Sequence, residues 1–278
     1  IGLDVGCRTA VFFFRWDISC GWDNLEDSAD HKCMGYDLET SRVIGANLMA
    51  YITSERNSAV PLSKALAYVD EGREAAGKFV IAQAVYEGTW RTRESGLSML
   101  LNTFHDKTLA PVRFERKVVE LGKNEVFDVP FIYLTGHEDF TLKDQERDNL
   151  QRFIKRGGVV FAEACCGRAG FDTAFRREIA KVLGDVKMEP LPPDHLIYRY
   201  PNVIQSVTPR PALARELKAN RLPPPLMGAR VDGHLGVIYS PVGLACGWEL
   251  AQCPYCRGIE SNDALALGVN VLSYILTQ

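Results

Sequence analysis

The sequence lacks the features that mark several classes of protein. It has no apolar run approaching the ~18 residues of a membrane-spanning helix, so we expect no span in this chain. Its 32 Lys and Arg residues do not outnumber the 35 Asp and Glu residues, and no basic stripe occurs, which argues against nucleic acid as a partner. No motif calls for a cofactor, and none is expected.

Cysteine is too scarce to define a disulfide-stapled mini-domain, with eight residues in a chain of 278. The chain begins with Ile1 rather than Met, so the lack of a signal peptide carries no information on the compartment. We favour a periplasmic or secreted location over a cytoplasmic one. The hydrophobic content of 46% is ordinary for a globular protein and is enough for a sizeable core.

What the sequence does contain is a partial repeat, in which four short motifs near the start recur near the end. The pairs are Cys20–Asp23 with Cys246–Glu249, Cys33–Gly35 with Cys256–Gly258, Gly45–Asn47 with Gly268–Asn270, and Tyr51–Ile52 with Tyr274–Ile275. The first pair is offset by 226 residues (20 to 246) and the later pairs by 223 (33 to 256). One small length change in a loop therefore accounts for the whole alignment.

Because only the tail of a domain is repeated, we expect residues 1–55 to be the C-terminal remnant of an upstream tandem copy. Residues 56–77 then form a linker with a short helix, and residues 78–278 form the complete domain. One strand and one helix cannot bury enough surface to be stable alone. Residues 1–55 should therefore dock on the main domain or on a partner chain.

Residues 78–278 alternate between strand-like and helix-like segments around a proline-rich excursion at 185–232. Strands are expected at 79–85, 112–121, 129–134, 158–164 and 235–240, and helices at 95–105, 141–156, 172–183 and 262–276. Thr141 should open its helix through a capping box. The alternation predicts an α/β fold with a flavodoxin-like, doubly wound, mainly parallel sheet. Ligands of such folds bind beyond the carboxyl ends of the strands.

Motifs in consistent order connect residues 78–278 to a known family. They are Tyr86–Trp90, Phe131–Phe140, Gly157–Gly158, Cys165–Gly167, Phe171–Asp172, Asp194–His195, Ile238–Ser240, Cys246–Glu249 and Gly268–Asn270. Together they resemble the bacterial family called domain of unknown function 4159, and residues 1–55 match its last segment again. That family is similar in fold to class I glutamine amidotransferases. Its biochemical function is not established, so the resemblance implies a fold rather than a reaction.

Cys165 is the main candidate for a nucleophile. It follows an apolar strand and precedes a glycine and a helix, which is where an amidotransferase-like fold holds its nucleophile on a sharp turn. The amidotransferase pattern Gly-x-Cys-x-Gly appears here with Glu163 in place of the first glycine. The late His-x-Glu of glutaminases is missing, which leaves His137 or His195 as a base. A small buried thiol packed behind a strand end is the favoured structural interpretation.

A ligand crevice is expected where the strands end, with an aromatic rim. Its candidate residues are Tyr86, Trp90, Thr135, Gly136, His137, Glu138, Asp139, Cys166 and Gly167. His137 could equally be a structural residue that hydrogen-bonds the backbone of its loop.

The remaining cysteines have several interpretations. Cys253 and Cys256 form a lone C-x-x-C, which is weak evidence for zinc, and no metal site is expected. The repeat matches Cys20 and Cys33 with Cys246 and Cys256. Cys20 should therefore lie near Cys33, and Cys246 near Cys256. Packing ranks first as the reason, a disulfide second and a metal third.

The sequence favours a ligand-binding or assembly module without glutaminase activity. Its partner would be another protein or a carbohydrate-like small molecule. The alternative is a cysteine-nucleophile hydrolase that uses Cys165, with His137 or His195 as the base.

Overall fold

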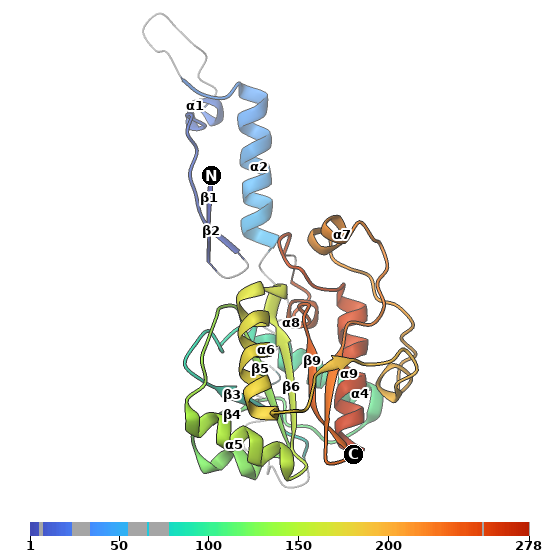
Figure 1. Ribbon diagram of the computed structural model, residues 1–278. Coiled ribbons are helices and arrows are strands. Elements are labelled where there is room, and N and C mark those ends of the chain that lie inside the picture. Colours follow the sequence, from blue (N-terminus) through green and yellow to red (C-terminus); the bar gives the residue numbers. More distant parts are fainter. Residues whose placement is uncertain (6–7, 24–33, 55–65, 67–77, 252, 278) are drawn as a thin grey trace, which may run out of the picture. The chain divides into compact units, whose positions relative to one another are not determined.

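A seven-stranded sheet organises the C-terminal part of the chain, as the computed structural model shows (Figure 1). The structure describes residues 1–5, 8–23, 34–54, 66, 78–251 and 253–277. These residues fall into two units, Ile1–Asn57 (unit 1) and Ser58–Gln278 (unit 2), and each unit is considered by itself. Apart from residue 66, the helix-bearing linker expected at 56–77 lies outside the described residues.

The sheet of unit 2 is mainly parallel. Its strands, in spatial order, are β4 (Lys117–Glu120), β3 (Ala82–Val85), β5 (Phe131–Gly136), β6 (Val159–Ala164), β9 (His234–Ser240), β8 (Met227–Val231) and β7 (Glu189–Pro190). The first five run parallel, and β8 and β7 continue the sheet antiparallel from β9. The α/β prediction is therefore confirmed.

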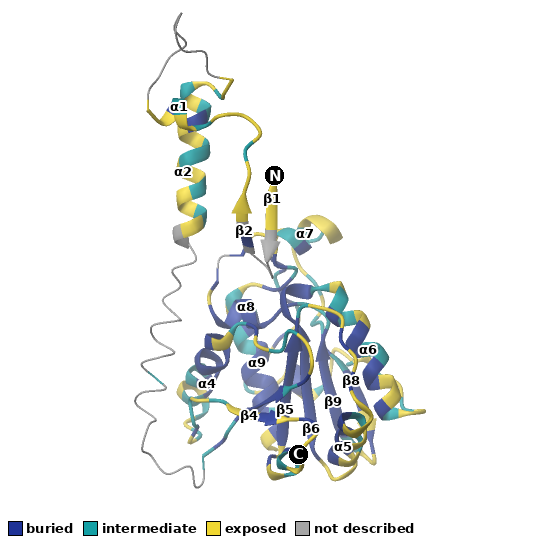
Figure 2. Cartoon of the chain, turned by 90° about the vertical axis from the view of Figure 1, so that its left-hand side faces the viewer, coloured by how far each residue is buried: buried dark blue, intermediate teal, exposed yellow. Residues whose placement is uncertain are grey.

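Helices cover both faces of this sheet because its central strands are apolar on both sides. Phe131 and Tyr133 of β5 enter the core under α4 (Glu94–Thr108) and α9 (Ser261–Leu276). Ile132 and Leu134 enter the core under α5 (Asp144–Lys155) and α6 (Ala169–Leu183). Figure 2 shows the dark, buried central strands β5, β6 and β9 between helices.

Two helices begin at other residues than expected, because an acidic side chain hydrogen-bonds the backbone at their starts. The helix expected from Thr141 begins at Asp144, because the Glu146 carboxylate accepts the Lys143 N–H at 2.8 Å. In unit 1 the helix expected from Thr40 or Ser41 begins at Leu38, because Asp37 accepts the Thr40 N–H at 2.9 Å.

The connecting segments contain short elements. They are η1 (Asn124–Asp128), η2 (Cys165–Gly167), η3 (Leu196–Tyr198), α7 (Pro211–Leu217) and α8 (Ala245–Trp248). The expected strand 112–121 shortens to β4, with only an isolated bridge between Phe79 and Val112 upstream. Among the described residues, no helix is both long and apolar enough to cross a membrane.

Unit 1 contains the same succession of elements as the end of unit 2. It consists of β1 (Gly2–Val5), β2 (Arg8–Phe12), α1 (Ser19–Trp22) and α2 (Leu38–Ser54). Gly2 lies opposite Phe12 as Gly228 lies opposite Ile238, and both hairpins shift register directly after the pair that follows, between Leu3 and Asp4 and between Ala229 and Arg230. The Trp22 indole donates to the Ser41 carbonyl at 2.8 Å, as the Trp248 indole donates to the Ala264 carbonyl at 2.9 Å.

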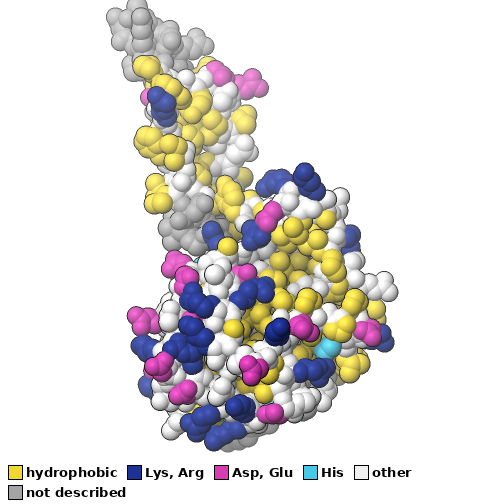
Figure 3. Space-filling model, viewed as in Figure 1, with side chains coloured by type: hydrophobic (Ala, Val, Ile, Leu, Met, Phe, Trp, Pro, Cys, Tyr) yellow, Lys and Arg dark blue, Asp and Glu magenta, His cyan; other side chains and the backbone are white. Residues whose placement is uncertain are grey.

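The two sets of elements differ in burial rather than in local structure. Trp248 is 0% exposed and Trp22 is 48% exposed. Val237 and Ile238 of β9 are fully buried, whereas Val11 and Phe12, 226 positions earlier, are exposed. Figure 3 shows apolar side chains at the surface over the elements of unit 1.

Candidate functional site

His137 and Cys165 meet at the carboxyl edge of the sheet. β5 and β6 are parallel and pair Gly136 with Ala164, so the residues that follow each strand are neighbours. His137 Nε2 lies 3.1 Å from Cys165 Sγ, within hydrogen-bond distance for a thiol. The structure therefore brings together two of the three residues that the sequence offered for catalysis.

This pair is enclosed. The Cys165 side chain is 0% exposed. A hydrogen bond with Cys166 lowers the pKa of Cys165, but a hydrogen bond with Cys246 and burial raise it more, so that pKa lies well above its usual value. Burial lowers the pKa of His137. At neutral pH the pair is therefore an uncharged thiol and an uncharged imidazole.

The sharp turn after β6 is made by Cys166 and Gly167. Cys166 has φ 56°, in the left-handed region that few side chains adopt, and Gly167 has φ 62°. A Cβ on Gly167 would lie 2.3 Å from the Arg257 carbonyl oxygen, so only glycine fits there. The Cys166 sulfur lies 3.0 Å from the Cys246 sulfur and is buried. Cys166, rather than Cys165, therefore has the strained backbone of this turn.

The Glu163 side chain connects the residues before this turn to β5 and to the start of α8 through hydrogen bonds. Its buried carboxylate accepts from the Tyr133 hydroxyl at 2.9 Å and from the Thr135 hydroxyl at 3.2 Å. It also accepts the N–H groups of Leu244 and Ala245 at the start of α8. Burial raises the pKa of Glu163 to about 7. The sequence showed Glu163 only as a departure from the amidotransferase glycine, and nothing in it indicated these contacts.

A cluster of buried thiols lies directly beneath the turn. The sulfurs of Cys166, Cys246 and Cys256 all lie within 4.8 Å of one another. Cys253, three residues before Cys256, is also buried. Cys246 and Cys256 lie together, as the repeat predicts. In unit 1, Cys20 is disulfide-bonded, while Cys33 lies outside the described residues.

The expected crevice residues between β3 and β5 mostly form a packed wall. The Tyr86 ring is buried, and its hydroxyl donates to the Thr135 carbonyl at 2.9 Å. A Cβ on Gly136 would meet the Tyr86 hydroxyl oxygen at 2.2 Å and the Phe171 ring at 2.6 Å, which makes glycine obligatory. The Trp90 carbonyl accepts from the Gln83 amide at 2.8 Å. These residues position the strand ends rather than line an open cavity.

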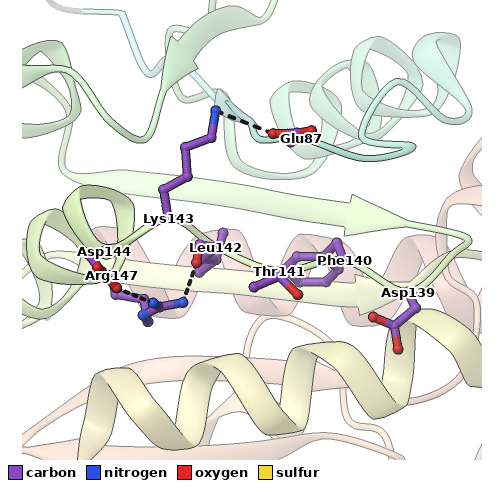
Figure 4. Close-up of a pocket in the computed structure, with 8 residues that line it drawn as sticks. All are labelled: Glu87, Asp139, Phe140, Thr141, Leu142, Lys143, Asp144 and Arg147. Carbon is purple, nitrogen blue, oxygen red and sulfur yellow. Dashed lines mark hydrogen bonds and ion pairs between the residues drawn. The ribbon is translucent and has the colours of Figure 1, made fainter.

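A hollow of about 660 Å³ lies beside this wall, between the loop after β3 and the start of α5 (Figure 4). Its lining residues are Glu87, Asp139, Phe140, Thr141, Leu142, Lys143, Asp144 and Arg147. Of the predicted crevice, it includes only Asp139, while Glu138 is exposed. Its charged groups are largely paired: Lys143 with Glu87 at 3.3 Å, Arg147 with Asp144, and Asp139 with Arg177 of α6 at 3.0 Å.

His195 lies at the opposite end of unit 2 from Cys165. Its Nδ1 accepts the Ile197 N–H at 3.2 Å at the start of η3, and its ring centroid lies 5.2 Å from that of Tyr274. The Arg210 guanidinium donates both to the Ser261 hydroxyl, at the first residue of α9, and to the Cys246 carbonyl. The first turn of α9 therefore lies on the side of the thiol cluster, and Tyr274 lies near the other end of this helix. From Ser261 to Tyr274, α9 rises about 20 Å. The structure therefore does not bring His195 to the candidate nucleophile.

Comparisons with known proteins place the C-terminal part of the chain in a family. The model of the family described as "Domain of unknown function (DUF4159)" matches residues 80–276. Among solved structures, a ThuA-like protein from Bacteroides uniformis is similar, with 12% sequence identity and a TM-score of 0.38. That match covers 75% of this chain and 96% of the other, and no conclusion about activity follows from it. Among curated proteins, none matches the chain.

Proposed function

Because the chain belongs to the family described as Domain of unknown function (DUF4159), its role has to be argued from its own residues, and we propose a protein-assembly module rather than a hydrolase. The observation that carries this proposal is the difference in burial between two equivalent sets of elements. Val11, Phe12 and Phe13 are 52%, 37% and 59% exposed. Their counterparts Val237, Ile238 and Tyr239 are 0% exposed.

Unit 2 shows what a complete environment for these elements contains. There β6 lies parallel to β9, pairing Val160 with Val237 and Phe161 with Ile238. In the two-stranded sheet of unit 1, β2 pairs with β1 among the described residues. A partner that lays an extended apolar segment along β2, as β6 lies along β9, would complete unit 1 in the same way.

The gain from such coverage is substantial. Burying one large apolar side chain contributes about 1.5–3 kcal/mol. Several such side chains in unit 1 are half-exposed or more, and a two-stranded sheet with one long helix is marginal by itself. Coverage by a second protein surface is therefore strongly favoured. We take a second copy of this chain as the partner to test.

The sheet order supports the fold expected for such a module. The five parallel strands lie in the spatial order β4-β3-β5-β6-β9, which, numbered along the chain, is the order 2-1-3-4-5 of flavodoxin-like sheets. β8 and β7 extend this sheet antiparallel. An amidotransferase-like fold would hold its nucleophile after β6. The side chains at that position, Cys165 and Cys166, are both buried, which supports a packing role over turnover.

The test is the mass of the full chain by sedimentation equilibrium over a range of concentrations. We expect self-association that weakens in Phe13→Asp and in Ile52→Asp. Val203→Asp, at an exposed apolar position of unit 2, is the matched control and should associate like the unaltered chain. A chain that stays monomeric and binds no hydrophobic dye would contradict the proposal, because its apolar surface would then be covered already.

The rival function is a cysteine hydrolase, favoured by the 3.1 Å contact between His137 and Cys165. Mass spectrometry after brief treatment of the native chain with a thiol-reactive probe distinguishes the two functions. We expect Cys165 to stay unlabelled at neutral pH because it is enclosed. Rapid labelling of Cys165 that disappears in His137→Ala would establish an activated nucleophile. A carbohydrate-like ligand would have the hollow of Figure 4 as its site, where it must displace existing ion pairs.

A further inference from the structure

We propose that Cys166, Cys246, Cys253 and Cys256 bind a zinc ion through four thiolates. The site lies beneath the turn after β6 and closes the segment between α8 and α9. This inference does not depend on the assembly role of unit 1.

Three of the four sulfurs lie about as close together as the ligands of a tetrahedral ion. Zn–S bonds of ~2.3 Å place the sulfurs of a four-thiolate site about 3.8 Å apart. The sulfurs of Cys166, Cys246 and Cys256 lie within 4.8 Å of one another, with Cys166 and Cys246 at 3.0 Å. The fourth thiol, Cys253, lies outside this group of three, but the C-x-x-C turn, in which the Cys256 N–H donates to the Cys253 carbonyl at 3.3 Å, holds its backbone beside them.

The backbone around the cluster holds three separate segments close together. The Arg257 N–H donates to the Cys166 carbonyl at 3.0 Å. A Cβ on Gly243 would lie 2.7 Å from the Cys166 nitrogen, and one on Gly258 would lie 2.9 Å from the Cys256 sulfur. Glycine at both positions therefore permits the close approach that brings the thiols together.

A buried cation beside the cluster lacks a counter-charge. Arg210 is 5% exposed, and within the described part of the chain it forms no ion pair with a carboxylate. Its guanidinium donates instead to the carbonyls of Cys246 at 3.2 Å, Ala251 at 2.6 Å and Ile259 at 3.1 Å. An uncompensated buried charge is costly. Zinc with four thiolates carries a net charge of about −2 and would supply the missing negative charge.

A comparison of the cysteines of units 1 and 2 favours a metal over a disulfide at the unit 2 cluster. Cys20, the counterpart of Cys246, is disulfide-bonded, whereas Cys166, Cys246, Cys253 and Cys256 form no disulfide. Unit 1 has no counterpart of Cys253, because the corresponding positions are acidic. A single disulfide would use only two of the four sulfurs, whereas a zinc ion uses all four. The fifth thiol, Cys165, lies 3.9 Å from Cys166 and contacts His137 instead.

The experiment uses the full chain, purified under a non-chelating reductant and equilibrated with zinc chloride. Elemental analysis and native mass spectrometry should find one zinc per chain. Cys246→Ser and Cys253→Ser should weaken zinc binding at least roughly 100-fold in a competition with a chromogenic chelator. Cys165→Ser and Cys20→Ser are the matched controls and should keep one zinc.

Replacement by Co²⁺ provides a readout that does not need a folded variant. The unaltered chain should show the absorption of tetrahedral cobalt bound by thiolates, and excess zinc should abolish it. Three results would each overturn the proposal: no metal bound by the reduced chain, a disulfide between Cys166 and Cys246 found by peptide mapping without reductant, or loss of zinc in Cys165→Ser with retention in Cys253→Ser.

Discussion

Replacing the two equivalent tryptophans by alanine should have very different effects. Trp248 and Trp22 occupy the same position of the same motif, and each indole donates to a carbonyl of the following long helix. Trp248 also packs against Tyr133 and Phe161, with ring centroids 5.8 and 6.2 Å away. Trp22 is half-exposed. The two substitutions therefore remove the same local hydrogen bond but very different amounts of packing.

The magnitudes follow from burial. Truncating a fully buried tryptophan costs about 3–5 kcal/mol, because the apolar transfer energy is lost and a cavity remains. At 48% exposure, roughly half of the transfer term remains for Trp22, or about 1–2 kcal/mol. These costs should raise the equilibrium constant for opening of the helix about 150- to 4,000-fold in Trp248→Ala and about 5- to 30-fold in Trp22→Ala.

Hydrogen exchange followed by mass spectrometry measures the two units separately. The amides of α9 should exchange faster in Trp248→Ala, and those of α2 should exchange faster in Trp22→Ala, each by its own factor. Equal acceleration in the two helices would refute the reasoning. That result would mean that the Trp22 side chain contributes as much packing as the Trp248 side chain, which its 48% exposure does not allow.

Three further predictions concern unit 2. Glu163→Gln should remove a pH dependence of the stability. Because burial raises the folded pKa of Glu163 from 4.5 to about 7, its stabilising effect is complete below pH 4.5 and is lost as the pH rises through 7, by about 3 kcal/mol. Denaturant titrations of the protein in the presence of a metal chelator measure this loss. Glu178→Gln should act in the opposite direction. Burial alone would raise the pKa of Glu178, but hydrogen bonds from Lys181, Arg177 and Arg147 lower it to about 2, so the variant should lack the stability that the unaltered chain loses as the pH falls from 4.5 to 2. Gly136→Ala should lower the free energy of unfolding by about 1–3 kcal/mol through overpacking, and an unchanged melting temperature would show that the strand end is looser than described.

The sequence predicted best those elements whose burial is uniform along the chain. β5 and β6 are apolar on both faces, so their continuous hydrophobic runs located them within two residues. β8 went unrecognised as an individual strand, because it lies in a proline-rich stretch and its pairing with β9 depends on a partner later in the chain. Helix starts were displaced where several residues near the terminus could serve as the cap, as at Thr141 and Lys143.

The site was predictable only as far as neighbouring strands could be inferred. His137 and Cys165 follow adjacent parallel strands, so their contact was accessible from the order of elements. The sequence also indicated the proximity of Cys246 to Cys256. It could not add Cys166 to them, because that requires knowing that β6 lies beside β9. Glu163 was missed for the same reason, since its partners lie about 80 residues later.

The paired hairpins bear on how the chain folds. β1–β2 and β8–β9 keep the same register and the same irregularity although their surroundings differ completely in burial. The register is therefore encoded in the hairpin itself and does not need the neighbouring parallel strand. Such hairpins form within about 1–10 μs, long before distant strands find each other. We expect β8–β9 to be an early template in unit 2, on whose exposed β9 edge β6 assembles later.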